Sequence, residues 1–169
     1  VMHGPLKHEL QTRFSGSVVS DEVLDDFVRR VYARGIYTTV DYSLEKHQES
    51  YKLVFMVKKN PVISDIQFDL SDIDSNFLMK GMKSKVGDVM DYNHIDDDIQ
   101  FINHYLTMKG YFLETVKSVA INDESVLLIS IESPKLRNIQ LIGLKKVKPF
   151  VVYRELIAKK NQRINDQLF

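Results

Sequence analysis

A repeat of about 75 residues limits the architectures open to this chain of 169 residues. Two amphipathic segments each end at a glycine that is followed by aromatic residues, and these glycines, Gly35 and Gly110, lie 75 positions apart. Downstream of each glycine, residues 59–68 and 132–141 align with one another at an offset of 73. This period is much longer than that of a solenoid repeat and is typical of a row of small domains.

Hydrophobic periodicity predicts the same elements in both copies. Apolar side chains recur at helical spacing in residues 23–34 and 95–109, and a glycine in the left-handed conformation is expected to end each helix. A short helix is also predicted at residues 77–82. Apolar alternation predicts strands at residues 38–44, 51–57, 63–70, 113–121 and 125–132. The full unit is therefore strand–helix–helix–strand–strand, which places the chain in the α+β class.

The repeat divides the chain into three modules, residues 1–60, 61–134 and 135–169. The central module is predicted to be complete, whereas the first lacks an obvious opening strand. The third is predicted to begin with a strand at residues 137–144 and a helix at residues 149–160, and to contain only these two elements.

Composition argues against several kinds of function. Lysine and arginine together number 23, as do aspartate and glutamate, so no net charge attracts nucleic acid or an anionic membrane. Without cysteine the chain forms no disulfide and no thiolate metal site. No apolar run approaches the roughly 20 residues that span a bilayer. The chain starts at Val1 rather than at methionine, which indicates a fragment or a processed product.

The segments that resemble catalytic or metal-binding motifs do not have the residue spacing that those motifs require. Residues 81–88 resemble a phosphate-binding loop, but five residues separate the two glycines and Asp88 places a negative charge where phosphate would lie. The acidic run at residues 96–98 lies at a helix start, where carboxylates favour the macrodipole, and lacks the spacing of a calcium loop. No His-Glu-x-x-His or Gly-x-Ser-x-Gly motif occurs. The sequence therefore predicts no catalytic residue, no metal site and no cofactor.

The segment from Gly87 to Val116 carries the pattern Gly-Asp-Val, Ile, Asp, Ile, Tyr, Gly-Tyr-Phe, Val. This pattern resembles the POTRA (polypeptide-transport-associated) domain, and residues 127–143 are similar to the junction between consecutive POTRA domains. The first junction departs from the family pattern, because Asn60 precedes its proline where an acidic residue and a glycine are usual. The resemblance implies tandem modules, each a three-stranded mixed sheet with two helices on one face.

Tandem POTRA domains imply a member of the outer-membrane β-barrel assembly and translocation superfamily, whose parent protein carries a C-terminal membrane barrel. The implied location is the periplasmic side of the outer membrane in a Gram-negative bacterium, or its organellar equivalent. The implied partners are unfolded outer-membrane proteins or accessory assembly subunits, bound without catalysis. The alternative is a structural spacer or oligomerisation module of a patatin-like lipase or a two-partner secretion protein. In that case the incomplete end modules self-associate, with residues 137–144 of one chain supplying the strand missing from the first module of another.

The resemblance also implies binding by edge-strand augmentation, in which an extended peptide pairs with the open backbone of an edge strand. In the family the strand after the second helix serves as this edge. The residues expected to form it are Tyr111, Phe112, Leu113, Thr115, Val116 and Ser118 in the central module, and Ile36, Tyr37, Thr39 and Val40 in the first. The alternative is that these strands only close their own sheets.

Two further surfaces have both a functional and a structural interpretation. Phe101 and Tyr105 either pad the surface of their helix or line a peptide groove between the two helices. The basic residues around the last helix either form a solvated face or a patch that meets a partner or a membrane. These are Lys145, Lys146, Lys148, Lys159 and Lys160.

Overall fold

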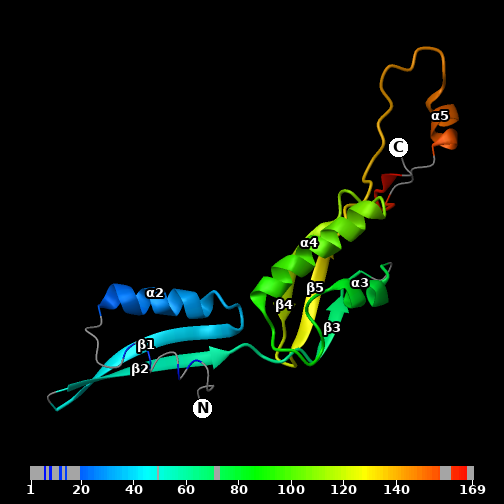
Figure 1. Cartoon of the computed structure of the whole chain (residues 1–169). Helices are drawn as coiled ribbons and strands as arrows, with labels where there is room; N and C mark the ends of the chain where they lie inside the picture. Colours follow the sequence, from blue (N-terminus) through cyan, green and yellow to red (C-terminus); the bar gives the residue numbers. More distant parts are fainter. Residues whose placement is uncertain are drawn as a thin grey trace.

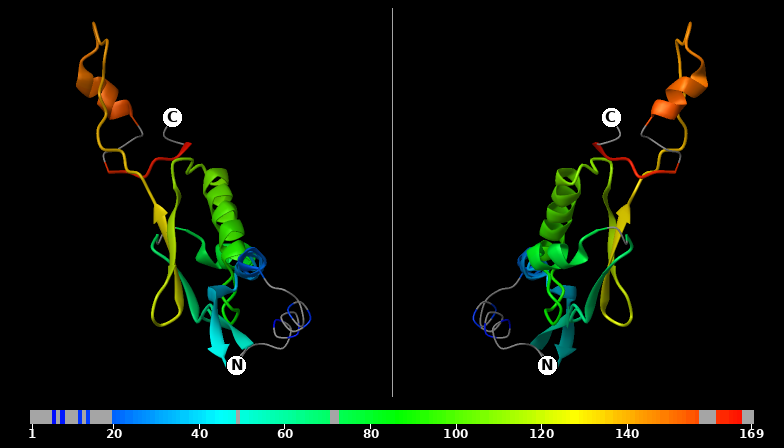
Figure 2. Two further views of the ribbon diagram at one scale, coloured as in Figure 1. Left: turned by 90° about the vertical axis from the view of Figure 1, so that its left-hand side faces the viewer. Right: turned by 90° about the vertical axis from the view of Figure 1, so that its right-hand side faces the viewer.

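The chain is an elongated molecule whose units follow one another along its length (Figures 1 and 2). The computed structural model describes residues 6, 8, 12, 14, 20–48, 50–70, 73–156 and 161–166. A hairpin with a covering helix lies at one end, a three-stranded sheet with two helices lies in the middle, and a short helix lies at the other end. Among the described residues, no helix combines the length and the apolar character that crossing a membrane requires.

The first unit packs a helix on a two-stranded hairpin. Helix α2 (Asp21–Tyr32) lies over β1 (Tyr37–His47) and β2 (Ser50–Lys59), which pair antiparallel. Phe27 of α2 is buried, and its ring meets the ring of Phe55 on β2 edge-on with the centroids 5.3 Å apart. This contact anchors the helix, because aromatic side chains bury more apolar area than any other type.

Two features of the first unit differ from the sequence prediction. The strands continue to His47 and resume at Ser50, so the turn is much shorter than the polar composition suggested, and Gln48 in it has a φ of 52°. Four described residues nearer the N-terminus, at positions 6, 8, 12 and 14, are helical. Leu6 is buried in the core of this unit and Phe14 packs against it, eight positions away on the same helical face. This helical segment was not predicted.

The central unit is a three-stranded mixed sheet with two helices on one face. Its strands lie in the order β3 (Asp65–Phe68), β5 (Val126–Glu132) and β4 (Thr115–Ile121), with β3 parallel and β4 antiparallel to β5. Helices α3 (Ser75–Gly81) and α4 (Tyr92–Met108) connect β3 to β4 (Figure 1). The predicted α+β module is therefore confirmed.

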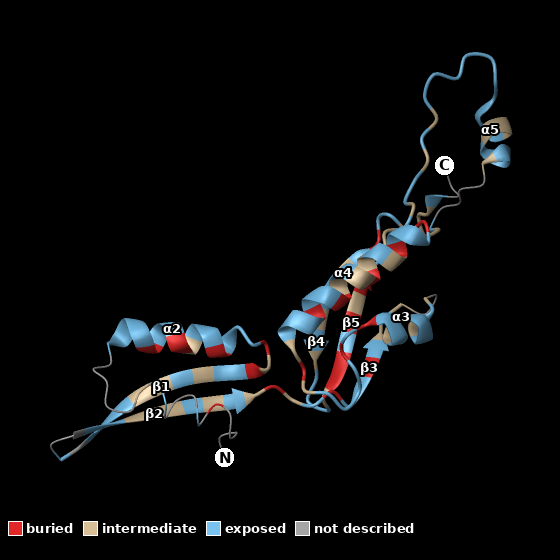
Figure 3. Ribbon diagram, viewed as in Figure 1, coloured by how far each residue is buried: buried red, intermediate tan, exposed pale blue. Residues whose placement is uncertain are grey.

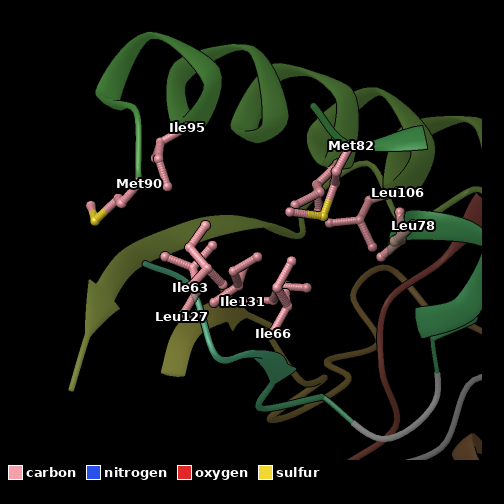
Figure 4. Packing of buried hydrophobic residues seen from close by; sticks show 11 residues of the cluster. Ile63, Ile66, Leu78, Met82, Met90, Ile95, Leu106, Leu127 and Ile131 are labelled. Carbon is pink, nitrogen blue, oxygen red and sulfur yellow. The ribbon is translucent and has the colours of Figure 1, made fainter. Parts of the chain in front are cut away.

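One continuous core lies between the sheet and the two helices (Figures 3 and 4). Side chains on β5 alternate, because Leu127, Ile129 and Ile131 are buried while Leu128 between them is exposed. The helices and their connections bury a matching set, of which Leu78, Met82, Met90, Ile95, Ile102 and Leu106 are members.

The third segment forms a helix without a sheet. Helix α5 (Pro149–Glu155) confirms the first part of the helix predicted at residues 149–160, whereas residues 157–160 lie outside the described part of the chain. The strand predicted at residues 137–144 does not form. In the central unit the opening strand β3 pairs only with β5, and no described residue supplies an equivalent of β5 here. The prediction was wrong because a strand needs a partner for its backbone groups.

Hydrogen bonds around Asn60 join the first and central units. The side-chain Nδ2 of Asn60 donates to the carbonyl oxygens of Gly35 and Met90, both at 2.8 Å. The backbone N–H of Asn60 donates to the carbonyl oxygen of Ile36 at 3.0 Å. The backbone N–H of Tyr92 donates to the carbonyl oxygen of Gly35, also at 3.0 Å. Asn60 is only 4% exposed, so its side chain loses these partners only if the junction opens.

A buried ion pair joins the central unit to the third segment. The Glu114 carboxylate, whose side chain is 0% exposed, accepts hydrogen bonds from the Arg163 guanidinium at 2.8 and 2.6 Å and from Ser133 Oγ at 2.6 Å. The guanidinium also lies over the ring of Tyr111, with its central carbon 4.2 Å from the ring centroid. The bidentate geometry fixes the direction in which the chain leaves the central unit.

The two junctions repeat one contact between a glycine and an aspartate. Gly35 and Gly110 have φ values of 76° and 84°, and a Cβ on either would overlap the carboxylate of Asp91 or Asp166, respectively. The two aspartates lie 75 positions apart, as the glycines do. The sequence repeat is therefore also a repeat of the way in which one unit meets the next.

Candidate functional site

Strand β4 offers the longer exposed edge of the central sheet. It pairs with β5 on one side only, and no strand among the described residues pairs with its other side. The opposite edge is β3, which has four residues against the seven of β4. A strand edge with free N–H and C=O groups is a template for a further strand.

The ladder with β5 determines which backbone groups of β4 point outward. Asn122 N–H donates to the carbonyl oxygen of Val126 at 3.1 Å, so the amide of Asn122 points toward β5. Along an antiparallel strand the backbone N–H and C=O groups of successive residues point alternately to the two sides. Those of Ala120 therefore point toward β5, and those of Val119 and Ile121 point away from it. The backbone N–H and C=O groups of Val119 and Ile121 therefore form the open edge of β4.

The start of the β4 edge is closed by a side chain. Asn103 of α4 accepts the N–H of Val116 through Oδ1 at 2.8 Å. The register between β4 and β5 shifts between Val116 and Ser118, which leaves Lys117 as a bulge. The open part of β4 is thus the stretch from Ser118 to Ile121, beyond this bulge.

Three of the residues predicted for the central edge lie outside the strand. Tyr111, Phe112 and Leu113 form the turn between α4 and β4, because β4 begins only at Thr115. The side chains of Phe112 and Leu113 are 47% and 45% exposed. The other predicted residues of this module, Thr115, Val116 and Ser118, lie in β4 as expected.

In the first unit the predicted edge residues lie at the start of β1. Ile36 precedes the strand and its carbonyl oxygen is bonded to Asn60, while the side chain of Tyr37 is 5% exposed and belongs to the core. Thr39 and Val40 lie within β1. Their strand pairs with β2 and with no other described strand.

Phe101 and Tyr105 pack against the core and also line an aromatic groove between α3 and α4. The ring of Phe77 on α3 stacks on Phe101 and Tyr105 of α4, with centroids 6.4 and 5.2 Å apart, and Lys109 Nζ lies 5.6 Å from the centroid of Tyr105. The groove encloses about 420 Å³. Phe77 is 51% exposed and was missed by the sequence analysis, which assigned it only to a short helix.

The basic residues near the last helix are exposed as far as they are described. Lys145, Lys146 and Lys148 lie on the surface ahead of α5, whereas Lys159 and Lys160 lie outside the described residues.

Two residues of the acidic run within α4, Asp97 and Asp98, accept hydrogen bonds from the loop that follows α3. Asp98 is buried and accepts the N–H groups of Lys83 at 2.5 Å and Ser84 at 3.0 Å. Asp97 accepts a hydrogen bond from Lys83 Nζ at 2.7 Å, and this bond and the adjacent negative charge raise the pKa of Lys83 above its ordinary value. No group of three or more histidines and carboxylates capable of holding a metal occurs in the described part of the chain.

Residues 61–133 match the POTRA family, described as the surface antigen variable number repeat. This match covers the whole central unit, from the residue after Asn60 to the end of β5. The central unit is a POTRA domain. The resemblance drawn from the segment between Gly87 and Val116 is thereby confirmed.

The chain is also similar to a protein of outer-membrane assembly. It is 22% identical over 146 residues to the outer membrane protein assembly factor BamA of Nitratidesulfovibrio vulgaris (strain Hildenborough), which covers 82% of this chain. The chain spans 18% of the length of that relative. The match extends over more than the central POTRA domain.

Two solved structures share the fold over 99% of the chain. The N-terminal domain of Omp85 from Thermosynechococcus elongatus has a TM-score of 0.79 at 15% identity, with 77% of its chain covered. The POTRA1-3 segment of the periplasmic domain of Omp85 from Anabaena has a TM-score of 0.69 at 16% identity, with 75% of its chain covered. The chain as a whole therefore shares the fold of tandem POTRA domains.

Proposed function

We propose that this chain is a non-catalytic polypeptide-binding scaffold of an outer-membrane protein assembly or translocation protein, and that it binds extended polypeptide at the open edge of β4. The observation that carries the proposal is the stretch from Ser118 to Ile121, where no described strand or side chain occupies the outward backbone groups. Backbone pairing is indifferent to side-chain identity, as binding of varied unfolded clients requires.

The side chains beside this edge favour a segment with alternating polarity. Val119 and Ile121 are half-buried and pack against the core on the helix side of the sheet. Ser118 and Ala120 are exposed on the opposite face. An added strand would place every second side chain next to the apolar pair, and cross-strand apolar neighbours stabilise such pairing. We therefore expect segments with apolar residues at alternate positions to bind best.

The similarity to BamA supports the cellular setting of the proposal. In this setting the chain lies on the periplasmic side of an outer membrane, its parent protein carries a C-terminal membrane barrel, and its partners are unfolded outer-membrane proteins or accessory assembly subunits. The modules that act together would be residues 1–60, 61–134 and 135–169, each contributing one unit of the row.

Backbone methylation of a bound peptide tests this proposal. A peptide of alternating valine and threonine is titrated against the chain, and single N-methyl groups are placed at successive positions. Because alternate amides face β4, methylation of these should weaken binding about tenfold, whereas methylation of the intervening amides should leave it unchanged. Equal tolerance of methylation at every position would rule out strand addition.

A matched pair of variants locates the binding edge. Val119→Pro removes one outward N–H of β4, and proline is tolerated at an edge where that N–H faces solvent. Val119→Thr keeps the N–H and a β-branched side chain. We expect weaker peptide binding by the proline variant only; equal binding by the two would place the site elsewhere.

A spacer role is the second candidate, and the ordered junctions favour it. The bonds of Asn60 and the ion pair between Glu114 and Arg163 hold successive units in fixed orientations, as a spacer requires. A chain that binds no extended peptide, yet keeps its inter-unit distances in solution, would support this role. Light scattering that shows a strict monomer over a wide concentration range would rule out strand exchange between copies.

A further inference from the structure

The amide of Asn103 takes the place of a strand at one position of the β4 edge. Its Oδ1 lies 2.8 Å from the backbone nitrogen of Val116, a normal distance for a ladder hydrogen bond. An added strand would have to present a carbonyl oxygen at this same donor. The bond is partly buried between α4 and the strand, so displacing it would leave the Asn103 carbonyl without its partner.

The same end of the sheet is closed on the other edge. Val116 pairs with Ile131 of β5, and the N–H of Ile131, which β3 is too short to reach, donates to Asp69 Oδ1 at 2.8 Å. A side-chain oxygen therefore closes each edge at this level of the sheet. The far end of β4, from Ser118 to Ile121, has no such closure among the described hydrogen bonds.

Among the described residues of the first unit, no helix side chain makes an equivalent of the Asn103 contact. The residue 75 positions earlier is Val28 of α2, whose side chain accepts no hydrogen bond. The hydrogen bond from a helix side chain to the edge strand is thus a feature of the central module. The repeated helix-and-hairpin arrangement does not require it.

We propose that Asn103 sets the register and the length of the polypeptide bound at β4, by restricting pairing to Ser118–Ile121. This proposal rests on the proposed binding of extended polypeptide at that edge. The Asn103 side chain positions the bound polypeptide, because it occupies the N–H of Val116 and leaves the outward N–H groups of Val119 and Ile121 open. The expected ligand is a short extended segment of about four residues, because each residue of an added strand faces one residue of β4.

Two substitutions at position 103 separate closure from helix packing. Asn103→Val introduces the residue of the first unit and removes the acceptor, whereas Asn103→Asp retains an oxygen at the same place. In the chain without peptide, hydrogen exchange of the Val116 amide should be slow in the wild type and in Asn103→Asp. It should become at least about tenfold faster in Asn103→Val, because the bond to Oδ1 is lost.

Peptide length provides the second measurement. A four-residue alternating peptide should bind the wild type and Asn103→Val equally, which also shows that the variant is folded. An eight-residue peptide should bind Asn103→Val about threefold to tenfold more tightly than the wild type, since it gains pairing at Val116. In the variant, N-methylation of one further peptide amide should weaken binding.

The outcomes distinguish this inference from the proposed function. If neither peptide binds the wild type, the proposed function fails, and the role of Asn103 in limiting a ligand fails with it. If both peptides bind and Asn103→Val shows no preference for the longer one, the edge binds polypeptide but Asn103 does not limit it. A Val116 amide that exchanges equally fast in all three proteins would show that the closure itself is absent.

Discussion

At the scale of single residues, Asp98 differs from its acidic neighbours. The sequence interpretation assigned residues 96–98 to the favourable end of the helix macrodipole, but α4 begins at Tyr92 and has no acidic residue in its first turn. Asp98 is instead 3% exposed and accepts two backbone N–H groups from the loop that follows α3. This carboxylate therefore fixes the connection between the two helices of the POTRA domain.

Replacement of Asp98 should destabilise the central unit. Asp98→Ala leaves the buried N–H of Ser84 and the partly buried N–H of Lys83 without an acceptor, so the free energy of unfolding should fall by about 2–5 kcal/mol. Urea unfolding followed by circular dichroism measures this change. Asp96→Ala is the matched control and should cost less than about 1 kcal/mol. Equal losses in the two variants would show that the loop bonds of Asp98 add nothing.

Glu114 should be essential for the second junction. Glu114→Gln leaves the Arg163 guanidinium partly buried opposite a neutral amide, and breaking one partner of a buried pair costs about 3–5 kcal/mol. We expect the junction to open locally, so the amide of Asp166, which donates to Gly110, should exchange hydrogen much faster.

Lys52→Ala serves as the control for this experiment. It removes an exposed ion pair with Glu45 in the first unit, which is worth at most about 1 kcal/mol. Exchange at Asp166 should not change in this variant. Slow exchange at Asp166 in Glu114→Gln would show that the ion pair does not hold the junction.

At the scale of elements, a side-chain contact ties the hairpin to its covering helix. The hydroxyl of Tyr42 on β1 donates to Asp25 of α2 at 3.1 Å. Desolvation at this half-buried position, the hydrogen bond, and the negative charges of Asp25, Asp21 and Asp41 raise the pKa of Tyr42 above its ordinary value of 10.0. The contact therefore requires the protonated phenol.

The titration of Tyr42 tests this contact. Because its pKa is higher in the folded than in the unfolded chain, the stabilisation is fully present below pH 10.0 and is lost as the pH rises through the folded-state pKa. Asp25→Asn should lower the pKa of Tyr42 toward its ordinary value. Ultraviolet absorbance, with Tyr42→Phe subtracted, isolates this tyrosine. An unchanged pKa in Asp25→Asn would contradict the assignment, and Asp123→Asn provides a distant control.

The elements that could be predicted from sequence are those with their own periodicity. Helices α2 and α4 and strands β4 and β5 lie within a few residues of their expected bounds, because apolar spacing reports which face is buried. The hairpin ends were misjudged, since pairing between β1 and β2 extends the strands through polar residues. The strand predicted at residues 137–144 does not form, because no described strand lies beside this segment to pair with it.

The candidate site was only partly accessible from sequence. The POTRA resemblance identified the strand after the second helix as an edge, and β4 is an edge of the sheet. Asn103 and Asp69, which close one end of that sheet, carry no local signal, because a polar residue on a helix surface or after a strand is ordinary. Their role depends on which backbone donor the tertiary fold brings within reach.

At the scale of the whole molecule, the junction glycines should control the arrangement of the units. Gly35→Ala forces a left-handed residue to carry a Cβ and also drives that Cβ into the Asp91 carboxylate. Gly87→Ala is the matched control, since Gly87 has a φ of 92° but open space around the added Cβ. Both should lose about 1–2 kcal/mol from backbone strain. Only Gly35→Ala should change the distance between spin labels on α2 and β5.

The two variants give distinct outcomes in this experiment. Identical label distances in Gly35→Ala and the wild type would mean that the glycine–aspartate contact does not orient the units. A changed distance in Gly87→Ala would show that backbone strain alone is sufficient to move them.

The glycine–aspartate contact that recurs every 75 residues has a geometric consequence for a longer array. When each link is made in the same manner, one fixed rotation and translation carries every domain onto its successor. Repetition of such a screw operation produces a spiral. The exposed edge strands of successive domains would then point in different directions around a common axis. A polypeptide that binds several domains would follow a helical path from one edge strand to the next.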